Sequence, residues 1–222
     1  VQGIGEASKY LNFPVVSGNV SFYNQTKEVG IKPTPSIGGV GLIKDYKKMV
    51  TMDFKKIDNL VLVIGKTEGH IDQSLFARAI LDEKNGPPPE VNLFNEKNNG
   101  ESLLNLINKD YIQSAHDISL GGLITAISKM CIQGNKGIKL KKANNFVNEL
   151  EYLFCEDQGR YIIEIKPEDL KEVTNLLDKN SVHYDELGII TDKEMIINQK
   201  TKLTIDELKS YYTNWLTNYM SA

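Results

Sequence analysis

A row of small polar side chains occupies residues 15–24, Val-Val-Ser-Gly-Asn-Val-Ser-Phe-Tyr-Asn. If this segment is a β-strand, its side chains alternate between two faces, and Ser17, Asn19 and Ser21 share one of them. Gly18 leaves the backbone bare, so that a ligand can approach it closely. Neutral oxygen donors about 6–7 Å apart suit a phosphate group or a hard cation such as Mg²⁺, which prefers oxygen ligands. The alternative is a half-exposed strand with a solvated polar face, although such faces usually carry Lys, Glu and Thr.

A second polar segment spans residues 115–123, Ala-His-Asp-Ile-Ser-Leu-Gly-Gly-Leu, at the start of an apolar run. Free backbone N–H groups at the beginning of a helix, with Ser119 nearby, form an anion site. The alternative is a helix entry at which Gly121 and Gly122 permit tight packing and Asp117 or Ser119 caps the helix.

The third segment is residues 154–160, Phe-Cys-Glu-Asp-Gln-Gly-Arg. Its acidic pair, Glu156 and Asp157, could bind a metal ion or a substrate. The alternative is a turn in which Arg160 forms a local ion pair. The sequence contains no recognisable Ser/His/Asp or Cys/His set and no Walker loop, and His116 beside Asp117 has low specificity as a metal ligand or base.

Interleaved strands and helices must position these three segments. The first part of the chain predicts a helix over 3–11, strands over 14–24 and 36–43, and a polar connection over 44–59. In the strand over 14–24, the face that carries Val16, Val20 and Phe22 must pack onto a core. From Leu60 onward, we predict strands over 60–65, 111–119, 137–141, 160–165, 184–191 and 195–199, and helices over 72–84, 92–108, 121–134, 145–153, 168–179 and 205–220. This alternation favours an α/β fold, or α+β sandwich.

Composition excludes several classes of protein. The 222 residues carry 26 basic and 29 acidic side chains, a net charge of −3, which argues against a nucleic-acid-binding protein with a basic face. No apolar run approaches the ~18–20 residues that span a bilayer, so we expect no membrane partner. The two cysteines have no CxxC spacing and favour a reducing cytoplasm. Because the chain begins with Val1 rather than Met, we expect it to be a piece of a longer protein.

The three segments together resemble the phosphoribosylformylglycinamidine synthase family, the ATP-dependent amidotransferases of purine biosynthesis. Residues 14–26 and then 31–43 are similar to the family pattern SGNVSLYNE, followed by PTP and a Gly-rich strand. Residues 115–123 are similar to AHDxSDGGL, and residues 154–163 to FxEDQGRYxV. Their order and spacing match, and the similarity covers essentially the whole chain.

The resemblance implies two homologous halves in the full enzyme, each with an N-terminal and a C-terminal domain of the aminoimidazole-ribonucleotide-synthetase type. Residues 1–55 would be the partial end of the second N-terminal-type domain, and residues 56–222 the C-terminal-type domain. The resemblance is to the small form of the enzyme, whose partners are a separate glutaminase subunit and a small bridging subunit. Residues 1–55 alone are marginal for stability, so we expect them to pair with a second chain as a homodimer or to be mobile.

The family reaction joins glutamine-derived ammonia to formylglycinamide ribonucleotide and uses ATP and Mg²⁺. The amide oxygen is phosphorylated, and ammonia then displaces phosphate. By the resemblance, Gly18 contacts ATP through its backbone, Asn19 supplies an oxygen to Mg²⁺, and Ser21 contacts the ribonucleotide. The catalytic histidines of the family belong to the first half, so no catalytic residue is assigned here, and the 222-residue chain alone is expected to be inactive.

The family also has a pseudo-symmetric second site, which in some members holds a structural nucleotide. The residues implied for it here are Asp117, Ser119, Gly121, Gly122 and Glu156. Two positions depart from the family pattern, because Leu120 replaces Asp and Cys155 replaces a small residue such as Gly.

Two other classes of function stay open at this point. One is a non-catalytic scaffold or assembly domain. The other is a further enzyme of the same synthetase superfamily, of the selenophosphate synthetase or thiamine monophosphate kinase type. Those enzymes lack the SGNVSxYN segment, whose presence here favours the amidotransferase.

Overall fold

The chain divides into two units in the computed structural model, which describes residues 1–21, 23–141 and 148–221. The first unit is Val1–Lys47 and the second is Lys48–Ala222. Residues 48–55 belong to the second unit because they pack onto it: Ala115 N donates to Thr51 O at 3.2 Å, and Phe54 N donates to Met130 O at 3.4 Å. The structural boundary therefore precedes the expected division after residue 55.

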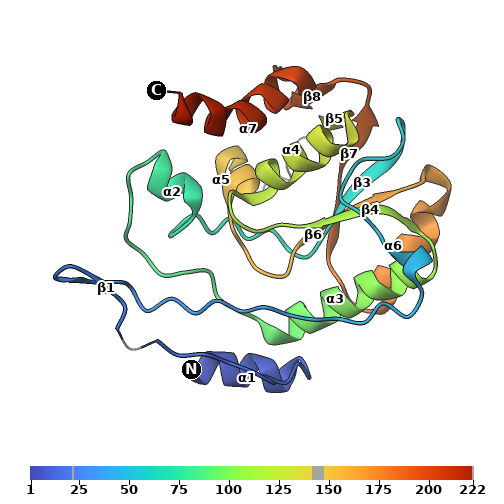
Figure 1. Cartoon of the computed structure of the whole chain (residues 1–222). Helices are drawn as coiled ribbons and strands as arrows, with labels where there is room; N and C mark the ends of the chain where they lie inside the picture. Colours follow the sequence, from blue (N-terminus) through green and yellow to red (C-terminus); the bar gives the residue numbers. More distant parts are fainter. Residues whose placement is uncertain (22, 142–147, 222) are drawn as a thin grey trace. The chain divides into compact units, whose positions relative to one another are not determined.

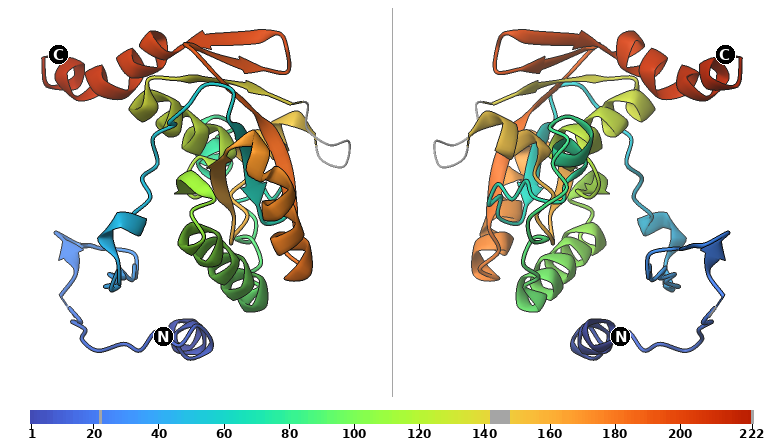
Figure 2. Two further views of the ribbon diagram at one scale, coloured as in Figure 1. Left: turned by 90° about the vertical axis from the view of Figure 1, so that its right-hand side faces the viewer. Right: turned by 90° about the vertical axis from the view of Figure 1, so that its left-hand side faces the viewer.

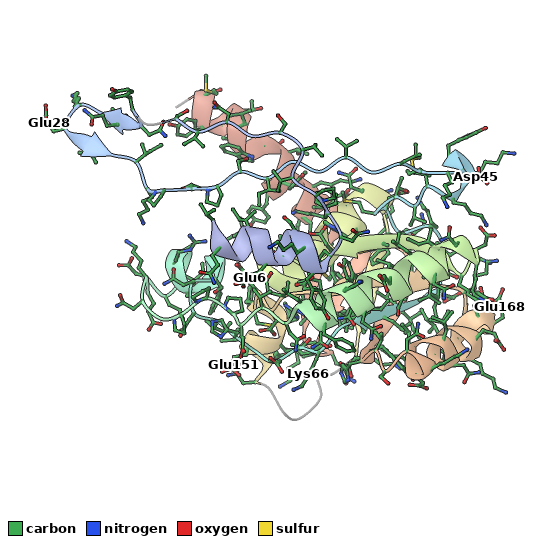
Figure 3. The ribbon with its side chains drawn as sticks, turned by 90° about the horizontal axis from the view of Figure 1, so that it is seen from below. Glu6, Glu28, Asp45, Lys66, Glu151 and Glu168 are labelled. Atoms are coloured by element: carbon green, nitrogen blue, oxygen red, sulfur yellow. The ribbon has the colours of Figure 1, made fainter. Side chains whose placement is uncertain are left out.

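The first unit contains little regular structure. Helix α1 spans Gln2–Tyr10, which confirms the predicted helix over 3–11. Strands β1 (Gln25–Thr26) and β2 (Val29–Gly30) form a short antiparallel hairpin. Figure 3 shows Glu28 at the tip of this hairpin. A 3₁₀ turn, η1 (Tyr46–Lys48), follows at the junction with the second unit.

The predicted strands over 14–24 and 36–43 are wrong. None of the described residues in those two ranges belongs to a strand, and Phe22 lies outside the described residues. Val16 is 91% exposed and Val20 is 74% exposed, so the apolar face does not pack onto a core within this unit. The physical reason is that an extended segment becomes a strand only by pairing with a neighbour, and the ladder of this unit ends after two residue pairs.

A seven-stranded sheet forms the centre of the second unit (Figure 1). Its strands are β3 (Leu60–Ile64), β4 (Ile112–Asp117), β5 (Gly137–Leu140), β6 (Tyr161–Ile165), β7 (Tyr184–Thr191), β8 (Glu194–Ile197) and β9 (Thr201–Thr204). Their spatial order is β4-β6-β3-β7-β5-β8-β9. Every pair is antiparallel except β5 with β8, and Leu62 of β3 pairs with Ile163 of β6.

Helices cover both faces of this sheet, which confirms the α/β sandwich (Figure 2). Strand β3 alternates its side chains, so that Val61 and Val63 enter one core and Leu62 and Ile64 enter the other. The helices that contribute to the first core are α4 (Gly122–Gly134), α5 (Glu149–Phe154) and the beginning of α7 (Ile205–Met220). The second core is formed with α3 (Leu93–Asn108) and α6 (Leu170–Lys179), which follows the 3₁₀ turn η2 (Pro167–Asp169).

Most element predictions beyond Leu60 are confirmed, with three differences. The helix over 72–84 shortens to α2, Leu75–Ala79, because Ser74 caps its start and the backbone of Asp82 turns left-handed just beyond its end. Helix α5 begins at Glu149, and residues 145–147 of the predicted helix lie outside the described residues. Strand β9 was not predicted; it follows a tight turn at Asn198 and Gln199, both with positive φ. Within the described ranges, no helix has the length and apolar character needed to cross a membrane.

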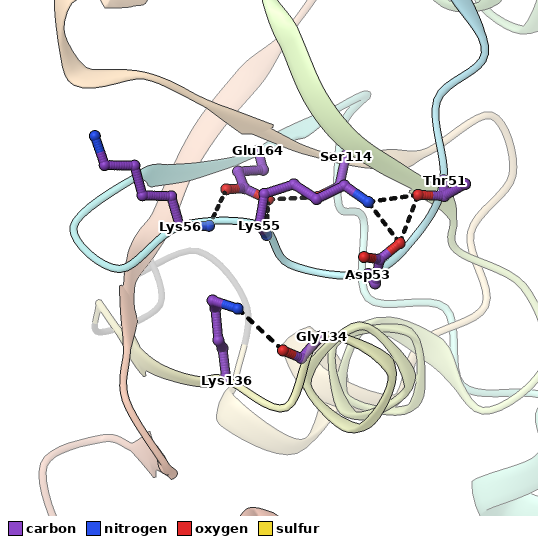
Figure 4. A network of polar contacts seen from close by, with 8 residues as sticks. All are labelled: Thr51, Asp53, Lys55, Lys56, Ser114, Gly134, Lys136 and Glu164. Carbon is purple, nitrogen blue, oxygen red and sulfur yellow. Dashed lines mark hydrogen bonds and ion pairs between the residues drawn. The ribbon is translucent and has the colours of Figure 1, made fainter.

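A buried carboxylate attaches the segment before β3 to the sheet (Figure 4). Glu164 of β6 has no exposed surface. Its carboxylate accepts hydrogen bonds from Lys55 N at 2.8 Å, Lys56 N at 3.0 Å and Asn59 Nδ2 at 2.7 Å. Ser114 Oγ of β4 donates a fourth, at 2.8 Å. The charge is therefore stabilised by neutral donors, which solvate a buried carboxylate within the core.

The same segment carries an exposed polar cluster. Lys55 Nζ lies 2.6 Å from Asp53 Oδ1 and donates to Thr51 Oγ1 at 2.6 Å. The hydrogen bonds from Lys55 and Thr51 lower the pKa of the Asp53 carboxyl below its ordinary value. Lys55 therefore contributes its backbone to the buried network and its side chain to the surface cluster, which fixes the conformation of residues 51–56.

We predict that Glu164→Gln lowers the free energy of unfolding by about 2 kcal/mol. The amide keeps the volume of the side chain but turns its nitrogen toward backbone N–H donors, one of which then loses its acceptor. Urea unfolding at pH 7 measures the loss, with the exposed Glu168→Gln as a matched control that stays within about 0.5 kcal/mol of the parent. Equal stability of both variants would show that the network contributes little.

Candidate functional site

The three residues predicted to bind ATP, Mg²⁺ and the ribonucleotide lie exposed in the first unit. Gly18, Asn19 and Ser21 follow one another along a segment without regular structure. A Cβ atom built on Gly18 would meet no atom within 4 Å. Asn24 Nδ2 donates to the Ser21 carbonyl at 2.8 Å, which leaves the Ser21 hydroxyl accessible. Their donor chemistry fits phosphate and Mg²⁺, and all three residues are exposed in the part of the first unit that the structure describes.

The residues predicted for the second site are brought together in the second unit. Asp117, Ser119 and Glu156 line a pocket of about 300 Å³. Its other lining residues are Glu96, Ile118, Leu120, Gln158, Gly159, Arg160 and Tyr161. Residues 117–120 therefore line one pocket with Glu156 and residues 158–160, between the end of β4 and the start of β6, whereas Gly121 and Gly122 do not line it.

The diglycine is required by backbone geometry and close packing. Gly121 and Gly122 have φ values of +86° and +71°, which side chains rarely adopt. A Cβ atom on Gly122 would lie 2.7 Å from the backbone carbon of Phe154. Tight packing at the helix entry is therefore confirmed for Gly122. The predicted cap by Asp117 or Ser119 is wrong, because Gly121 is the N-cap residue of α4 and no side chain caps it.

The amide groups of the diglycine are not free to bind an external anion. Glu156 Oε1 accepts from Gly121 N at 2.8 Å and from Leu75 N, at the start of α2, at 2.7 Å. Gly122 N donates to the Ser119 carbonyl at 3.0 Å. The anion site expected at Gly121 and Gly122 is thus filled by a carboxylate of the chain itself.

The neighbouring acidic residue performs a similar role for another loop. Asp157 accepts from the backbone N–H groups of Glu68, Gly69 and His70 at 2.7–3.1 Å. Arg160 is 1% exposed and donates to the carbonyl oxygens of Cys155 and Asp157, at 2.8 and 3.2 Å. Its third donor bond goes to Thr67 Oγ1 at 3.2 Å. Residues 154–160 therefore form a structural turn, but its Arg160 binds carbonyl and hydroxyl oxygens rather than the expected carboxylate.

A second pocket of about 420 Å³ adjoins the first, because both are lined by Glu96, Gln158 and Gly159. It adds Lys66, Glu68 and His70 from the loop after β3, Glu90 from the loop before α3, and Asn95 from the first turn of α3. Lys66 Nζ lies 2.8 Å from Glu68 Oε1. We call these two pockets together the acidic cleft.

Carboxylates dominate the electrostatics of the acidic cleft. Burial raises the pKa of the Glu96 carboxyl, which lies on α3. Burial, and then the negative charges of Glu96 and Asp117, raise the pKa of the Tyr161 hydroxyl. The hydrogen bond and charge of Glu68 raise the pKa of the Lys66 amine. Arg160, which also lines the cleft, is already bound to oxygens of the protein.

The acidic cleft therefore does not fit a nucleotide that relies on free N–H groups and basic side chains for its phosphates. Leu120 is 55% exposed at its edge and offers no polar contact. Cys155 is buried, and burial raises the pKa of its thiol to about 11. Among the residues that the structure describes, no three His, Cys, Asp or Glu side chains are arranged to hold a metal ion.

His116, on the edge strand β4, does not line the acidic cleft. Its Nδ1 is 3.0 Å from Asp117 Oδ1. Its Nε2 is buried and is the one such side-chain atom, within the described ranges, that has no hydrogen-bond partner. A groove of about 690 Å³ runs beside it, lined by Thr51, Asp53, Gln133 and several apolar residues. The expectation that His116 is not the catalytic base stays a prediction.

Sequence reasoning missed three residues that build the cleft. Asp157 was considered as a metal or substrate ligand and Arg160 as a partner in a local ion pair, and Glu96 was not singled out. Asp157 and Arg160 are both buried. An acidic residue and an arginine that flank a glycine before an apolar strand could have indicated a polar turn packed inside the fold.

The family model for "AIR synthase related protein, C-terminal domain" matches residues 56–198. The chain is 71% identical, over 220 residues, to the phosphoribosylformylglycinamidine synthase subunit PurL of Pelagibacter ubique. It is 41% identical, again over 220 residues, to the subunit of the same name from Bartonella henselae. These matches cover 99% of this chain but only 30% of each relative, so the chain spans less than a third of their length.

Solved structures show the same fold at low sequence identity. The Thermotoga maritima PurL structure described as complexed with FGAR aligns with a TM-score of 0.60 at 16% identity, over 73% of this chain and 30% of that chain. The one described as complexed with ATP gives a TM-score of 0.58 at 15% identity, over 73% of this chain and 27% of that chain. A structure of HypE from E. coli, a hydrogenase maturation protein, aligns with a TM-score of 0.51 at 13% identity, over 70% of this chain and 51% of that chain.

We predict that Glu156→Ala lowers the free energy of unfolding by about 2–3 kcal/mol. Two backbone donors lose their acceptor: Gly121 N, whose bond to Glu156 is partly buried, and Leu75 N, whose bond is exposed. A buried donor left unpaired costs about 1–3 kcal/mol, and the exposed bond adds less. Urea unfolding at pH 7 measures the effect, and the exposed Glu101→Ala serves as the control. A Glu156→Ala variant as stable as the control would mean that water satisfies both amides.

Proposed function

Since the chain belongs to the family of AIR synthase related proteins, C-terminal domain, we propose that it is the carboxyl-terminal part of an ATP-dependent ligase. The ligase would join glutamine-derived ammonia to formylglycinamide ribonucleotide and form formylglycinamidine ribonucleotide in purine biosynthesis. The observation that carries this proposal is the 71% identity to the Pelagibacter ubique synthase subunit along 99% of the chain.

The similarity to that relative extends across both units, so it includes the exposed segment that carries Gly18, Asn19 and Ser21. A scaffold that served only to dock partners would need no such set of small oxygen and amide groups. We assign the Gly18 backbone to ATP, the Asn19 side-chain oxygen to Mg²⁺, and the Ser21 hydroxyl to the ribonucleotide. All three groups are exposed in the first unit, which supports a role in contacting ligands.

ATP would supply the phosphoryl group that activates the substrate amide, and Mg²⁺ would neutralise phosphate charge. The residues of this chain would act by binding and orientation. The bare backbone at Gly18 would allow close approach of a phosphate, and a hydroxyl at Ser21 would fix the ribonucleotide by a hydrogen bond. The remaining wall of the site would come from elsewhere in the synthase, because the first unit does not enclose these groups.

The acidic cleft of the second unit would serve the fold rather than the reaction. Its Gly121 amide is bound by Glu156, and its Asp157 carboxylate is bound by three backbone amides. Ammonia would reach the synthase from a separate glutaminase subunit with the help of a small bridging subunit. We place the enzyme in the cytoplasm, where its two buried cysteines stay reduced.

The proposal is tested by comparing this chain with a chimera, in which it replaces the matching 220 residues of the Pelagibacter ubique subunit. We predict that the 222-residue chain alone forms no formylglycinamidine ribonucleotide from ATP, formylglycinamide ribonucleotide and ammonia, whereas the chimera does. The reason is that the chain matches only 30% of that subunit, so the rest of the proposed catalytic site is missing from it. Turnover by the isolated chain, or an inactive but folded chimera, would contradict the proposal.

In the active chimera, we predict that Asn19→Ala mainly weakens the use of Mg·ATP, whereas Ser21→Ala mainly raises the KM for the ribonucleotide. Each loses one hydrogen bond or ligand contact of about 1–3 kcal/mol, or roughly 10- to 100-fold. Ser8→Ala, on α1, is the matched control and keeps the parent kinetics. Unchanged kinetics in both test variants would favour the scaffold function.

A further inference from the structure

Helix α7 leaves most of its apolar side chains exposed. Of its 16 residues, Ile205 at the beginning is buried, and Leu208 packs partly against the core. Beyond them, four aromatic side chains are exposed: Tyr211 (79%), Tyr212 (50%), Trp215 (62%) and Tyr219 (73%). Leu216 and Met220 are exposed as well. Both views of Figure 2 show this end of α7 extending past α4 and the sheet.

Three of the exposed aromatic side chains, Tyr212, Trp215 and Tyr219, form one stripe with Leu208, and Tyr211, Leu216 and Met220 flank it on the two sides. Residues 208, 212, 215 and 219 recur at the i, i+4, i+7, i+11 spacing that places them along one side of a helix. The opposite side carries Ser210, Asn214 and Thr217. The stripe begins at the packed Leu208, so the exposed surface continues a face that is already buried at its base. We call residues 211, 212, 215, 216, 219 and 220 the aromatic face.

The size of the aromatic face indicates what covers it. Fully burying an aromatic side chain removes about 150–250 Å² from water, so four aromatics exposed to these extents offer about 500 Å². With an equal area from a partner, the interface would reach about 1,000 Å². That value falls within the about 600–1,500 Å² of interfaces between domains of one chain. The exposed parts of Leu216 and Met220 add to this area, so the aromatic face is large enough for an interface between domains.

The length of the relatives supplies an occupant of this kind. This chain matches 30% of the length of the Pelagibacter ubique subunit. The other 70% of that subunit has no counterpart in this chain. Resting on the proposed function, we propose that the aromatic face docks into an apolar groove on that remaining part of the synthase polypeptide, as an interface between its domains. A helix laid into a groove uses anchors at this spacing. The rest of the synthase, rather than a second copy of this chain, is the occupant.

Single cysteines test the proposal by their accessibility to a maleimide. Trp215→Cys places a thiol in the middle of the aromatic face, and Asn214→Cys places one on the opposite, polar side as the matched control. The native Cys131 and Cys155 are buried, and burial raises the pKa of their thiols to about 12 and about 11, so they react slowly at pH 7. Mass spectrometry of peptides reads each site separately, in the 222-residue chain and in the chimera.

We expect both cysteines to react at similar rates in the 222-residue chain. In the chimera, we expect Trp215→Cys to react at least tenfold more slowly and Asn214→Cys to keep its rate. Equal rates at position 215 in both proteins would overturn the proposal. Protection at 215 in the isolated chain, together with a dimeric mass by light scattering, would overturn it in favour of a second copy.

Two further measurements keep the outcome unambiguous. Far-UV circular dichroism checks that each variant folds, and Tyr211→Cys replaces Trp215→Cys if the latter does not. Turnover by the chimera reports on the proposed function, whereas labelling reports on docking. An active chimera with an accessible position 215 would refute the docking alone, and an inactive chimera with a protected position 215 would refute the function alone.

Discussion

Backbone amides and carbonyls from three separate segments converge on residues 155–160. Glu156 binds amides at the starts of α2 and α4, Asp157 binds three amides of the loop after β3, and the buried Arg160 binds carbonyl oxygens of its own turn. Loops that pass through a protein interior need such partners, because an unpaired backbone group there costs free energy. The walls of the acidic cleft are held in place by this turn, and its chemistry is therefore already used within the fold.

Glu164 applies the same principle inside the sheet. Its carboxylate is fully buried, and two amides, one side-chain amide and one hydroxyl bind it. Removing a donor or the acceptor from such a network leaves a buried polar group unpaired, which makes these networks specific for one conformation. Glu156, Asp157 and Glu164 thus accept hydrogen bonds from donors of the protein itself. This explains how acidic residues close to a pocket can have structural rather than catalytic roles.

The sequence predicts the second unit well, because its signals are local. The run Leu60–Ile64 reads as a buried strand, and the periodicity of residues 93–108 and 122–134 reads as helices packed on a sheet. The roles of the polar residues were harder to predict. Glu156 and Gly121 are 35 positions apart, and no spacing rule indicates that the carboxylate of one fills the anion site of the other. Strand β9 was missed because its pairing depends on a turn at Asn198 and Gln199, whose positive φ values a sequence pattern does not specify.

The first unit shows the opposite relation between sequence and structure. Residues 14–24 carry the alternation of a strand, yet the residues described among them are exposed and belong to no strand. An alternating pattern specifies which side chains share a face, but it does not specify which strand pairs with the segment. The identity of Gly18, Asn19 and Ser21 specifies the ligands they can bind, and that information is local. Their geometry would be set by whatever strand or domain pairs with this segment. The same holds for the aromatic face of α7. The spacing of its residues can be read from the sequence, whereas their burial would depend on contacts with a distant part of the protein. The residues of this chain are sufficient to form the sheet and its two cores. The surfaces that we propose for ligand binding and for docking are exposed, and they would be completed by contacts with the rest of the synthase.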